Sequence, residues 1–186
     1  MARIVLGLGG SIAAYKAVDL CSKLVQAGHE VDVVMTRTAC RFVGPLSFSA
    51  LTHRAALLDA TWGEGDQPAA HLRATEKADL FVVAPATADL IGKFANGIAD
   101  EIVSTTYLGA SCPVLVAPAM NRRMWKHPRV VHNVERIVAD GVRLVGPGTG
   151  FLAERDEGPG RMAEPEEILE AIRATLGIGA AKRKRT

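Results

Sequence analysis

The sequence is short of aromatic residues and of net charge. Phenylalanine, tryptophan and tyrosine make up 5% of its 186 residues, whereas apolar residues as a whole make up 48%. The core must therefore consist of valine, isoleucine, leucine and alanine, which is typical of a parallel sheet buried under helices. The net charge of +2 gives no support for nucleic acid as a partner. The first apolar run, residues 4–8, is too short for a membrane span or for the apolar part of a signal peptide. We therefore expect neither a nucleic-acid nor a membrane partner.

Cysteine is also scarce, with only Cys21, Cys40 and Cys112. No two of them have the spacing of metal ligands, so no metal site is expected. An odd number of cysteines without a signal peptide indicates reduced thiols and a cytoplasmic location. The length suits one domain, which we place at residues 1–178. The basic tail, 179–186, is expected to be disordered, with an anion-binding arm as the alternative.

Short apolar runs alternate with segments of helical periodicity along the chain. The expected strands are 4–8, 31–35, 80–84, 113–117 and 142–145. The expected helices are 12–27, 36–42, 46–51, 87–107 with a break near 96–97, 128–139 and 165–176. Polar or glycine- and proline-rich composition predicts loops at 59–70 and 146–160.

This alternation predicts an α/β fold, a Rossmann-like (flavodoxin-like) doubly wound parallel sheet in three layers. Ligands of such sheets bind beyond the carboxyl ends of the strands. The loops expected at that edge are 9–11, 36 onward, 85–89 and 118–121.

Gly9, Gly10 and Ser11 separate the first expected strand from the first helix. Glycines let the backbone approach an anion closely, and the free N–H groups of a helix start bind it. The Gly-x-Gly-x-x-Gly fingerprint of dinucleotide-binding proteins is incomplete here. In addition, Met35 and Thr36 stand where such proteins have an acidic residue after the second strand. These features favour a mononucleotide phosphate over NAD. A tight turn without a ligand is the alternative.

Four segments occur together in one order: 10–16, 85–89, 118–125 and 158–162. They resemble the homo-oligomeric flavin-containing cysteine decarboxylases, and 118–125 fits that family's Pro-x-Met-Asn-x-x-Met-Trp pattern at every fixed position. The resemblance covers residues 3–176. It implies FMN as the cofactor and a homotrimer with active sites between subunits, which is often built into a dodecamer. Because the chain ends before the ligase domain that often follows in bacterial relatives, we expect a stand-alone decarboxylase.

The likeness is greatest to members that decarboxylate (R)-4'-phosphopantothenoylcysteine to 4'-phosphopantetheine in coenzyme A biosynthesis. It implies that the flavin oxidises the substrate thiol to a C=S group, which accepts the electrons left behind by carbon dioxide. The resulting ene-thiol is then reduced. The flavin contacts that the resemblance implies are Gly10, Ser11, Ile12, Thr36, Pro85, Ala86, Thr87 and Asp89. Two of these have structural alternatives, Thr36 as a helix cap and Asp89 as a first-turn acid.

His71 matches the histidine that is essential in this family, and a group that titrates near neutral pH can move a proton or orient the thiol. Asn121 is expected to bind the substrate carboxylate through its amide, without a positive charge that would oppose loss of carbon dioxide. A turn cap is the alternative role for Asn121. The remaining substrate contacts are expected from Met120, Met124 and, on a flap over the substrate, Arg161 and Met162. Asp100 and Glu101 are adjacent, so they do not face each other on a helix, and we interpret them as a solvated helix start.

One position departs from the family. A cysteine of the late loop supplies the last proton in relatives that make phosphopantetheine, and Glu154 stands in its place. Glu154 is predicted to be the proton donor, which requires a carboxyl pKa raised by burial. Otherwise the product stays an ene-thiol, formed from a C-terminal peptide cysteine or another thiol, as in the lantibiotic decarboxylases. A non-catalytic FMN-binding protein is a further alternative, which the presence of both His71 and Asn121 opposes.

Overall fold

The computed structural model describes residues 1–59, 75–151 and 157–178. His71, Glu154, the tail 179–186 and most of the expected loop 59–70 lie outside the described residues. The described strands of the main sheet are β1 (Arg3–Leu8), β2 (Glu30–Met35), β3 (Leu57–Leu58), β4 (Leu80–Ala86), β5 (Val114–Pro118) and β6 (Arg143–Leu144). They lie in the order β3-β2-β1-β4-β5-β6, and each neighbouring pair is parallel. This order is that of a Rossmann fold, so the predicted fold class is confirmed.

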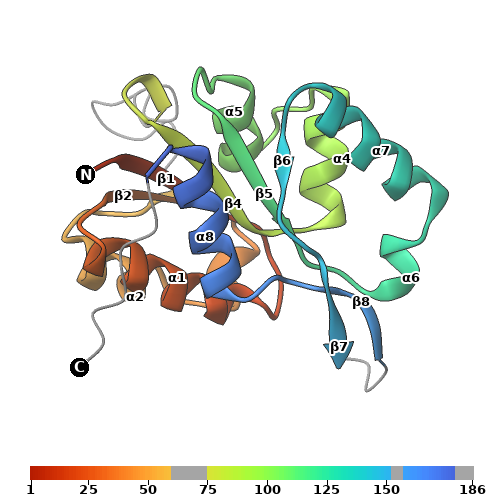
Figure 1. Cartoon of the computed structure of the whole chain (residues 1–186), viewed down its shortest axis with the longest axis horizontal. Coiled ribbons are helices and arrows are strands. Elements are labelled where there is room, and N and C mark those ends of the chain that lie inside the picture. The colour runs from red at the N-terminus through yellow and green to blue at the C-terminus, as the bar shows by residue number, and fades with distance from the viewer. Residues whose placement is uncertain (60–74, 152–156, 179–186) are drawn as a thin grey trace.

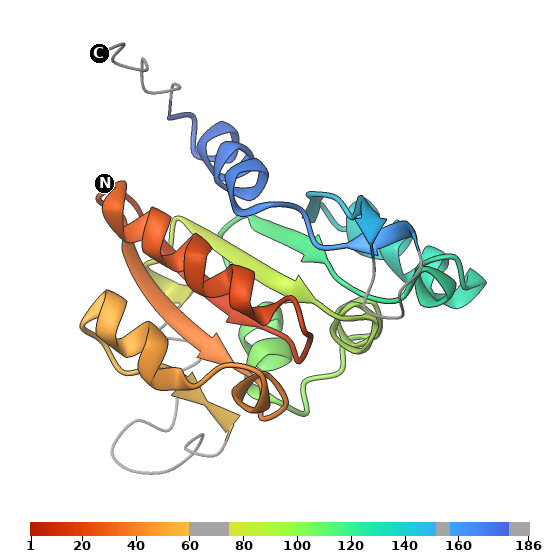
Figure 2. The same ribbon diagram turned by 90° about the horizontal axis from the view of Figure 1, so that it is seen from below.

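Helices cover both faces of the sheet (Figures 1 and 2). Because side chains of a strand alternate between faces, Ile4, Leu6 and Leu8 point into one core and Val5 into the other. The first core is completed by α1 (Ala14–Gln26), α2 (Pro45–Thr52) and α8 (Pro165–Thr175). The second is completed by α4 (Ala88–Asn96), α5 (Ile102–Leu108) and α7 (Pro128–Ala139). The result is the three-layer arrangement that the apolar composition predicts.

The expected loop 146–160 contains a β-hairpin instead. Strand β7 (Gly148–Phe151) pairs antiparallel with β8 (Glu157–Arg161), and the hairpin extends away from the sheet beside α6 (Arg122–Trp125) (Figure 1). Glycine and proline are depleted in strands, and both strands are rich in glycine, so the composition indicated a loop. Strand β8 also contacts α6, a tertiary contact that no local pattern reveals.

Smaller differences occur at the ends of the elements. The expected helix 36–42 is a turn followed by a short 3₁₀ helix, η1 (Ala39–Arg41), and β3 was not predicted. The first helix begins at Ala14 rather than at residue 12, because residues 10–13 belong to the loop before it. The break expected near 96–97 is confirmed, since Gly97 ends α4 in the left-handed conformation with φ of 66°. Among the helices of the described residues, none has the length and apolar character needed to cross a bilayer.

Candidate functional site

The carboxyl ends of the central strands open onto a cavity of about 780 Å³. This volume falls within the range of pockets for cofactors and small molecules. Its walls come from all four loops that the sequence placed at this edge, together with Asp59 and residues of β7 and β8. The residues proposed from sequence that line it are Gly10, Ser11, Ile12, Thr36, Thr87, Asp89, Met120, Asn121, Met124, Arg161 and Met162. The structure therefore brings together residues more than 150 positions apart in the chain.

The loop between β1 and α1 exposes backbone donors to this cavity. Within the described residues, the N–H groups of Gly10, Ser11 and Ile12 have no hydrogen-bond acceptor. The Ser11 hydroxyl accepts the Ala13 N–H at 3.2 Å, which closes the turn just before the helix. A Cβ atom at Gly10 would overlap the side chain of Thr38. Three adjacent free donors beside the positive end of a helix of 13 residues form a cradle that suits a phosphate.

The loop after β2 is held in place by two side chains. The Thr36 hydroxyl accepts the N–H of Ala39 at 3.0 Å, and Thr36 also lines the cavity. Thr38 occupies the N-cap position of η1, so Thr36 holds the start of this helix without being its cap residue. Asp59 accepts the N–H of Arg37 at 2.9 Å through one oxygen and the N–H of Ile102 at 2.7 Å through the other. Asp59 thereby ties the loop after β2 to the start of α5.

Of the flavin contacts expected at the end of β4 and in the loop after it, only Thr87 and Asp89 line the cavity. Thr87 caps α4 by accepting the Leu90 N–H at 3.3 Å, and Asp89 forms an ion pair with Lys93 at 3.2 Å. Pro85 and Ala86 are buried and are not among the residues that line the cavity. Their carbonyl groups accept the N–H groups of neighbouring segments, at positions 9 and 119, at 2.9 Å each. They therefore connect the loops that carry the site.

Glu101 is not the solvated residue that the sequence suggested. Its side chain is buried and caps α5 by accepting the N–H groups of Val103 and Ser104. Burial raises the pKa of Glu101, while these hydrogen bonds oppose the shift. The neighbouring Asp100 is exposed, as expected, and pairs with Lys93 at 2.9 Å. The sequence could not separate the two acids because only the packing of α5 decides which one is covered.

Replacing Glu101 with alanine is expected to lower the free energy of unfolding by about 1–3 kcal/mol, because two N–H groups of α5 lose their acceptor in a buried place. Urea unfolding measures the change. Asp100→Ala is the matched control, since it removes an exposed acid from the adjacent position, and its effect should be small. Equal effects of the two substitutions would contradict the capping role of Glu101.

Asn121 begins α6 directly after β5. Its Oδ1 accepts the N–H of Arg123 at 2.6 Å, so the turn-cap alternative is observed. This hydrogen bond also fixes the orientation of the amide, because the carbonyl end is held by the helix. The NH₂ end has no acceptor among the described residues, and Asn121 lines the cavity. The same side chain can therefore cap a helix and offer two donors to a ligand.

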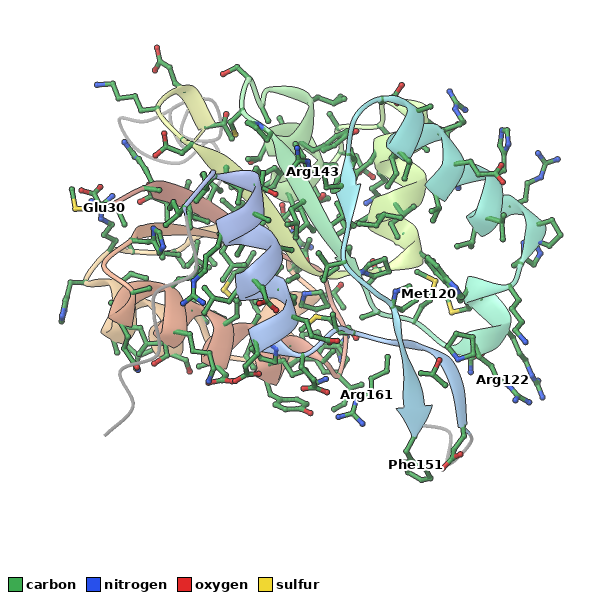
Figure 3. The ribbon with its side chains drawn as sticks, in the orientation of Figure 1. Glu30, Met120, Arg122, Arg143, Phe151 and Arg161 are labelled. Carbon is green, nitrogen blue, oxygen red and sulfur yellow. The ribbon has the colours of Figure 1, made fainter. Side chains whose placement is uncertain are left out.

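The hairpin contributes Phe151, Gly160 and Arg161 to the lining of the cavity. Gly160 has φ of 138°, and a Cβ atom there would overlap the Met120 carbonyl. The Met120 N–H donates to the Gly160 carbonyl at 3.0 Å, so β8 is joined to the loop that carries Asn121. Figure 3 shows Met120 at the root of the hairpin and Phe151 at its far end. Gly160, Arg161 and Met162 therefore line the cavity, while the flap over the substrate stays a prediction.

Several lining residues were missed as site residues, among them Lys16, Asp59 and Glu101. A signal existed for Lys16, which stands four positions before Leu20 on the apolar face of the first helix. Nothing in the local sequence marked Asp59. The predictions for His71 and Glu154 stay predictions, because both residues lie outside the described part of the chain.

The fold and the cavity together define a Rossmann-like α/β protein with an anion cradle at the carboxyl edge of its sheet. Residues 1–177 match the flavoprotein family, and the chain belongs to it. It is 47% identical over 167 residues to the coenzyme A biosynthesis bifunctional protein CoaBC of Bacillus subtilis, covering 90% of this chain and 41% of that protein. The CoaBC protein of Mycolicibacterium smegmatis is 45% identical over 178 residues, covering 94% and 42%. The chain thus spans about two fifths of the length of these relatives.

Solved structures agree with this membership. A PPC decarboxylase mutant complexed with pantothenoylaminoethenethiol superimposes with a TM-score of 0.84 at 30% identity, covering 95% of this chain and 98% of that one. The FMN-dependent cysteine decarboxylase SpaF superimposes with a TM-score of 0.82 at 33% identity, covering 97% and 98%. The resemblance to flavin-containing cysteine decarboxylases that the four sequence segments indicated is therefore confirmed.

Proposed function

We propose that the chain is an FMN-dependent decarboxylase that converts (R)-4'-phosphopantothenoylcysteine into 4'-phosphopantetheine and carbon dioxide in coenzyme A biosynthesis. The observation that carries this proposal is one cavity lined both by the free N–H groups of residues 10–12 and by the Asn121 amide. Two relatives that are 47% and 45% identical are named for coenzyme A biosynthesis. A third similar protein of known structure is named PPC decarboxylase.

FMN fits the residues that are present. Gly10, Ser11 and Ile12 would hold the phosphate through their backbone N–H groups, with the Thr36 hydroxyl nearby on the same wall. Thr87 and Asp89, on the adjacent loop, are the remaining proposed flavin contacts on the cavity. When bound, FMN supplies the two-electron oxidation of the substrate thiol. We assign Pro85 and Ala86 a supporting role, because they hold the neighbouring loops through their carbonyl groups.

Among the described lining residues four are basic, Lys16, Arg37, Lys93 and Arg161, and all except Arg37 pair with a carboxylate of the described residues. Lys16 and Arg161 both pair with Glu164, and Lys93 pairs with Asp89 and Asp100. A bare cation beside the substrate carboxylate would stabilise the reactant more than the transition state, in which the charge leaves the carboxyl group. Asn121 instead offers neutral donors. We propose that its NH₂ group orients the carboxylate, with Met120, Met124 and Met162 against the apolar parts of the substrate.

The roles of two residues outside the described part are proposed from sequence alone. His71 is proposed to move the proton of the thiol or to orient it, and Glu154 to donate the last proton. Glu154 also defines the second candidate function. If this residue does not donate, the reaction ends at an ene-thiol, formed from a C-terminal peptide cysteine or another thiol, and SpaF is an FMN-dependent cysteine decarboxylase of similar fold.

Mass spectrometry of the product separates these candidates. The purified holoprotein incubated with phosphopantothenoylcysteine is expected to yield 4'-phosphopantetheine. A product two hydrogens lighter would favour the ene-thiol candidate. No loss of carbon dioxide from this substrate would contradict the proposed function and direct the test to peptides that end in cysteine, with a non-catalytic FMN-binding protein as the last alternative.

Self-association is proposed as a homotrimer, with further assembly into a dodecamer. The support is a set of exposed apolar side chains at the mouth of the cavity and next to it, in particular Ile12 with 64% of its surface exposed and Tyr15 with 60%. Phe42 and Leu46 are exposed on the adjacent elements. A second subunit would cover them and complete the site, and light scattering that shows a monomer would refute this. The division into a domain over 1–178 and a tail, and the cytoplasmic location, likewise remain proposals.

A further inference from the structure

A buried lysine joins the first helix to the strand that closes the cavity. The Lys16 side chain is only 5% exposed, and its Nζ donates to the Met162 carbonyl at 3.1 Å and to Glu164 Oε1 at 2.8 Å. Charged side chains are rarely buried without a specific partner, because removal of the charge from water is costly. Here two acceptors, both on the segment directly after β8, compensate for that cost. The ammonium group therefore fixes the end of the hairpin against α1.

The same carboxylate oxygen holds a second cation. Arg161 Nη2 donates to Glu164 Oε1 at 2.9 Å, so the ammonium group of Lys16 and the guanidinium group of Arg161 converge on one atom. Glu164 is itself fixed, because its backbone N–H donates to the Glu167 carboxylate at 2.7 Å at the start of α8. The hydrogen bond from Lys16 is the main cause that lowers the pKa of Glu164, in agreement with a carboxylate that stays charged.

Lys16 connects Arg161 and Glu164 to the loop before α1, so it lies between two parts of the cavity wall. Lys16 lies on the first turn of α1, and the Ala14 N–H donates to the Ser11 carbonyl at 3.0 Å, so the loop with the free donors leads directly into that turn. On the other side, Arg161 and Met162 line the cavity on the segment proposed as the flap. Figure 3 shows Arg161 on the side of the hairpin that faces α1 and α8.

We propose that Lys16 and Glu164 are positioning residues for substrate binding. They hold Arg161 and the Met162 backbone at the edge of the cavity, in a fixed position relative to the loop before α1. Arg161 is 42% exposed, so its guanidinium group stays accessible to an anionic group of the substrate other than the reacting carboxylate. This inference rests on the proposed function for its kinetic test, but its structural part can be measured without substrate.

The chain offers a matched control on the same helix. Lys23 lies seven residues, or two turns, after Lys16 and also reaches α8, where its Nζ approaches Glu166 at 3.3 Å. Lys23 is 30% exposed and does not line the cavity. Lys16→Met and Lys23→Met therefore each remove one lysine that connects α1 to α8 or to its N-cap residue. Of the two lysines, only Lys16 contacts the segment proposed as the flap. Lys16→Met should fold, because Glu164 is 47% exposed and keeps its ion pair with Arg161, so the substitution leaves no buried unpaired charge.

The experiment compares these two variants with the wild-type protein, all loaded with FMN. For Lys16→Met we expect faster hydrogen exchange of the amides in residues 157–164 and a KM for phosphopantothenoylcysteine that is about tenfold higher. Its Tm, its kcat and its affinity for FMN should change little. Lys23→Met should match the wild-type protein in exchange and in KM. A merely structural role would lower Tm and would not split KM from kcat in this way.

A double variant tests whether Lys16 acts through Glu164. Glu164→Gln should raise KM in the same direction, and Lys16→Met combined with Glu164→Gln should be no worse than Lys16→Met alone. Additive effects, or wild-type exchange and KM in Lys16→Met, would overturn the inference. If the wild-type protein does not turn over this substrate, the proposed function fails, and the hydrogen-exchange comparison alone still decides the positioning role.

Discussion

Replacement of Asn121 by aspartate is expected to lower kcat by at least about 100-fold while the protein keeps its flavin. Aspartate is as good a helix cap as asparagine, so the oxygen that accepts the Arg123 N–H is retained and α6 should stay intact. The other end of the side chain changes from an NH₂ donor into a second carboxylate oxygen. That oxygen would repel the substrate carboxylate at the point where the amide is proposed to bind it.

The measurement is the single-turnover rate of carbon dioxide release together with the FMN content of the purified variant. Asn96→Asp is the control, because Asn96 ends α4 on the exposed surface and does not line the cavity. It should leave both quantities near the wild-type values. A fully active Asn121→Asp protein would remove the amide from the proposed mechanism and leave Asn121 as a cap only.

Replacement of Gly10 by alanine is expected to lower the affinity for FMN by at least about 100-fold. The added Cβ would overlap the Thr38 side chain, so either the loop 10–13 or the turn after β2 must move. Each movement disturbs the three free N–H groups of the cradle, and hydrogen bonds to a charged phosphate are the strongest that these groups can form. The main loss should therefore be in flavin binding rather than in folding.

Quenching of flavin fluorescence measures this affinity. Gly44→Ala is the matched control, since a Cβ atom there would meet no heavy atom within 4 Å and Gly44 has an ordinary φ of −73°. If Gly10→Ala binds FMN as tightly as Gly44→Ala, the phosphate lies elsewhere in the cavity.

The fold could be predicted from the sequence wherever burial leaves a periodic signal. β1 and β4 are almost uninterrupted apolar runs, because both of their faces are covered by helices. α1 and α7 carry a clear apolar face. The short strand β3 contains two residues, too few for a period to appear, whereas β6 falls within the expected strand 142–145. The hairpin β7–β8 is stabilised by contacts with α6 and by tolerance of glycine at Gly160, so its composition misled the prediction.

The site could be predicted in part from the topology of the sheet rather than from periodicity. Parallel strands place their carboxyl ends at one edge, so Ser11, Thr87 and Asn121 had to lie close together once the strands were identified. Glu101 caps its own helix by accepting the N–H groups of Val103 and Ser104, and only its burial could not be predicted. Asp59 escaped prediction because it holds backbone N–H groups of segments far away in the chain. Such partners are set by tertiary packing and leave no mark on neighbouring residues.

A crystal structure of the FMN-loaded protein tests the central proposal most directly. We predict the phosphate within hydrogen-bond distance of the N–H groups of Gly10, Ser11 and Ile12, and the Asn121 NH₂ group facing the flavin ring. A flavin bound outside this cavity, or an Asn121 side chain directed away from the ring in every copy, would contradict it.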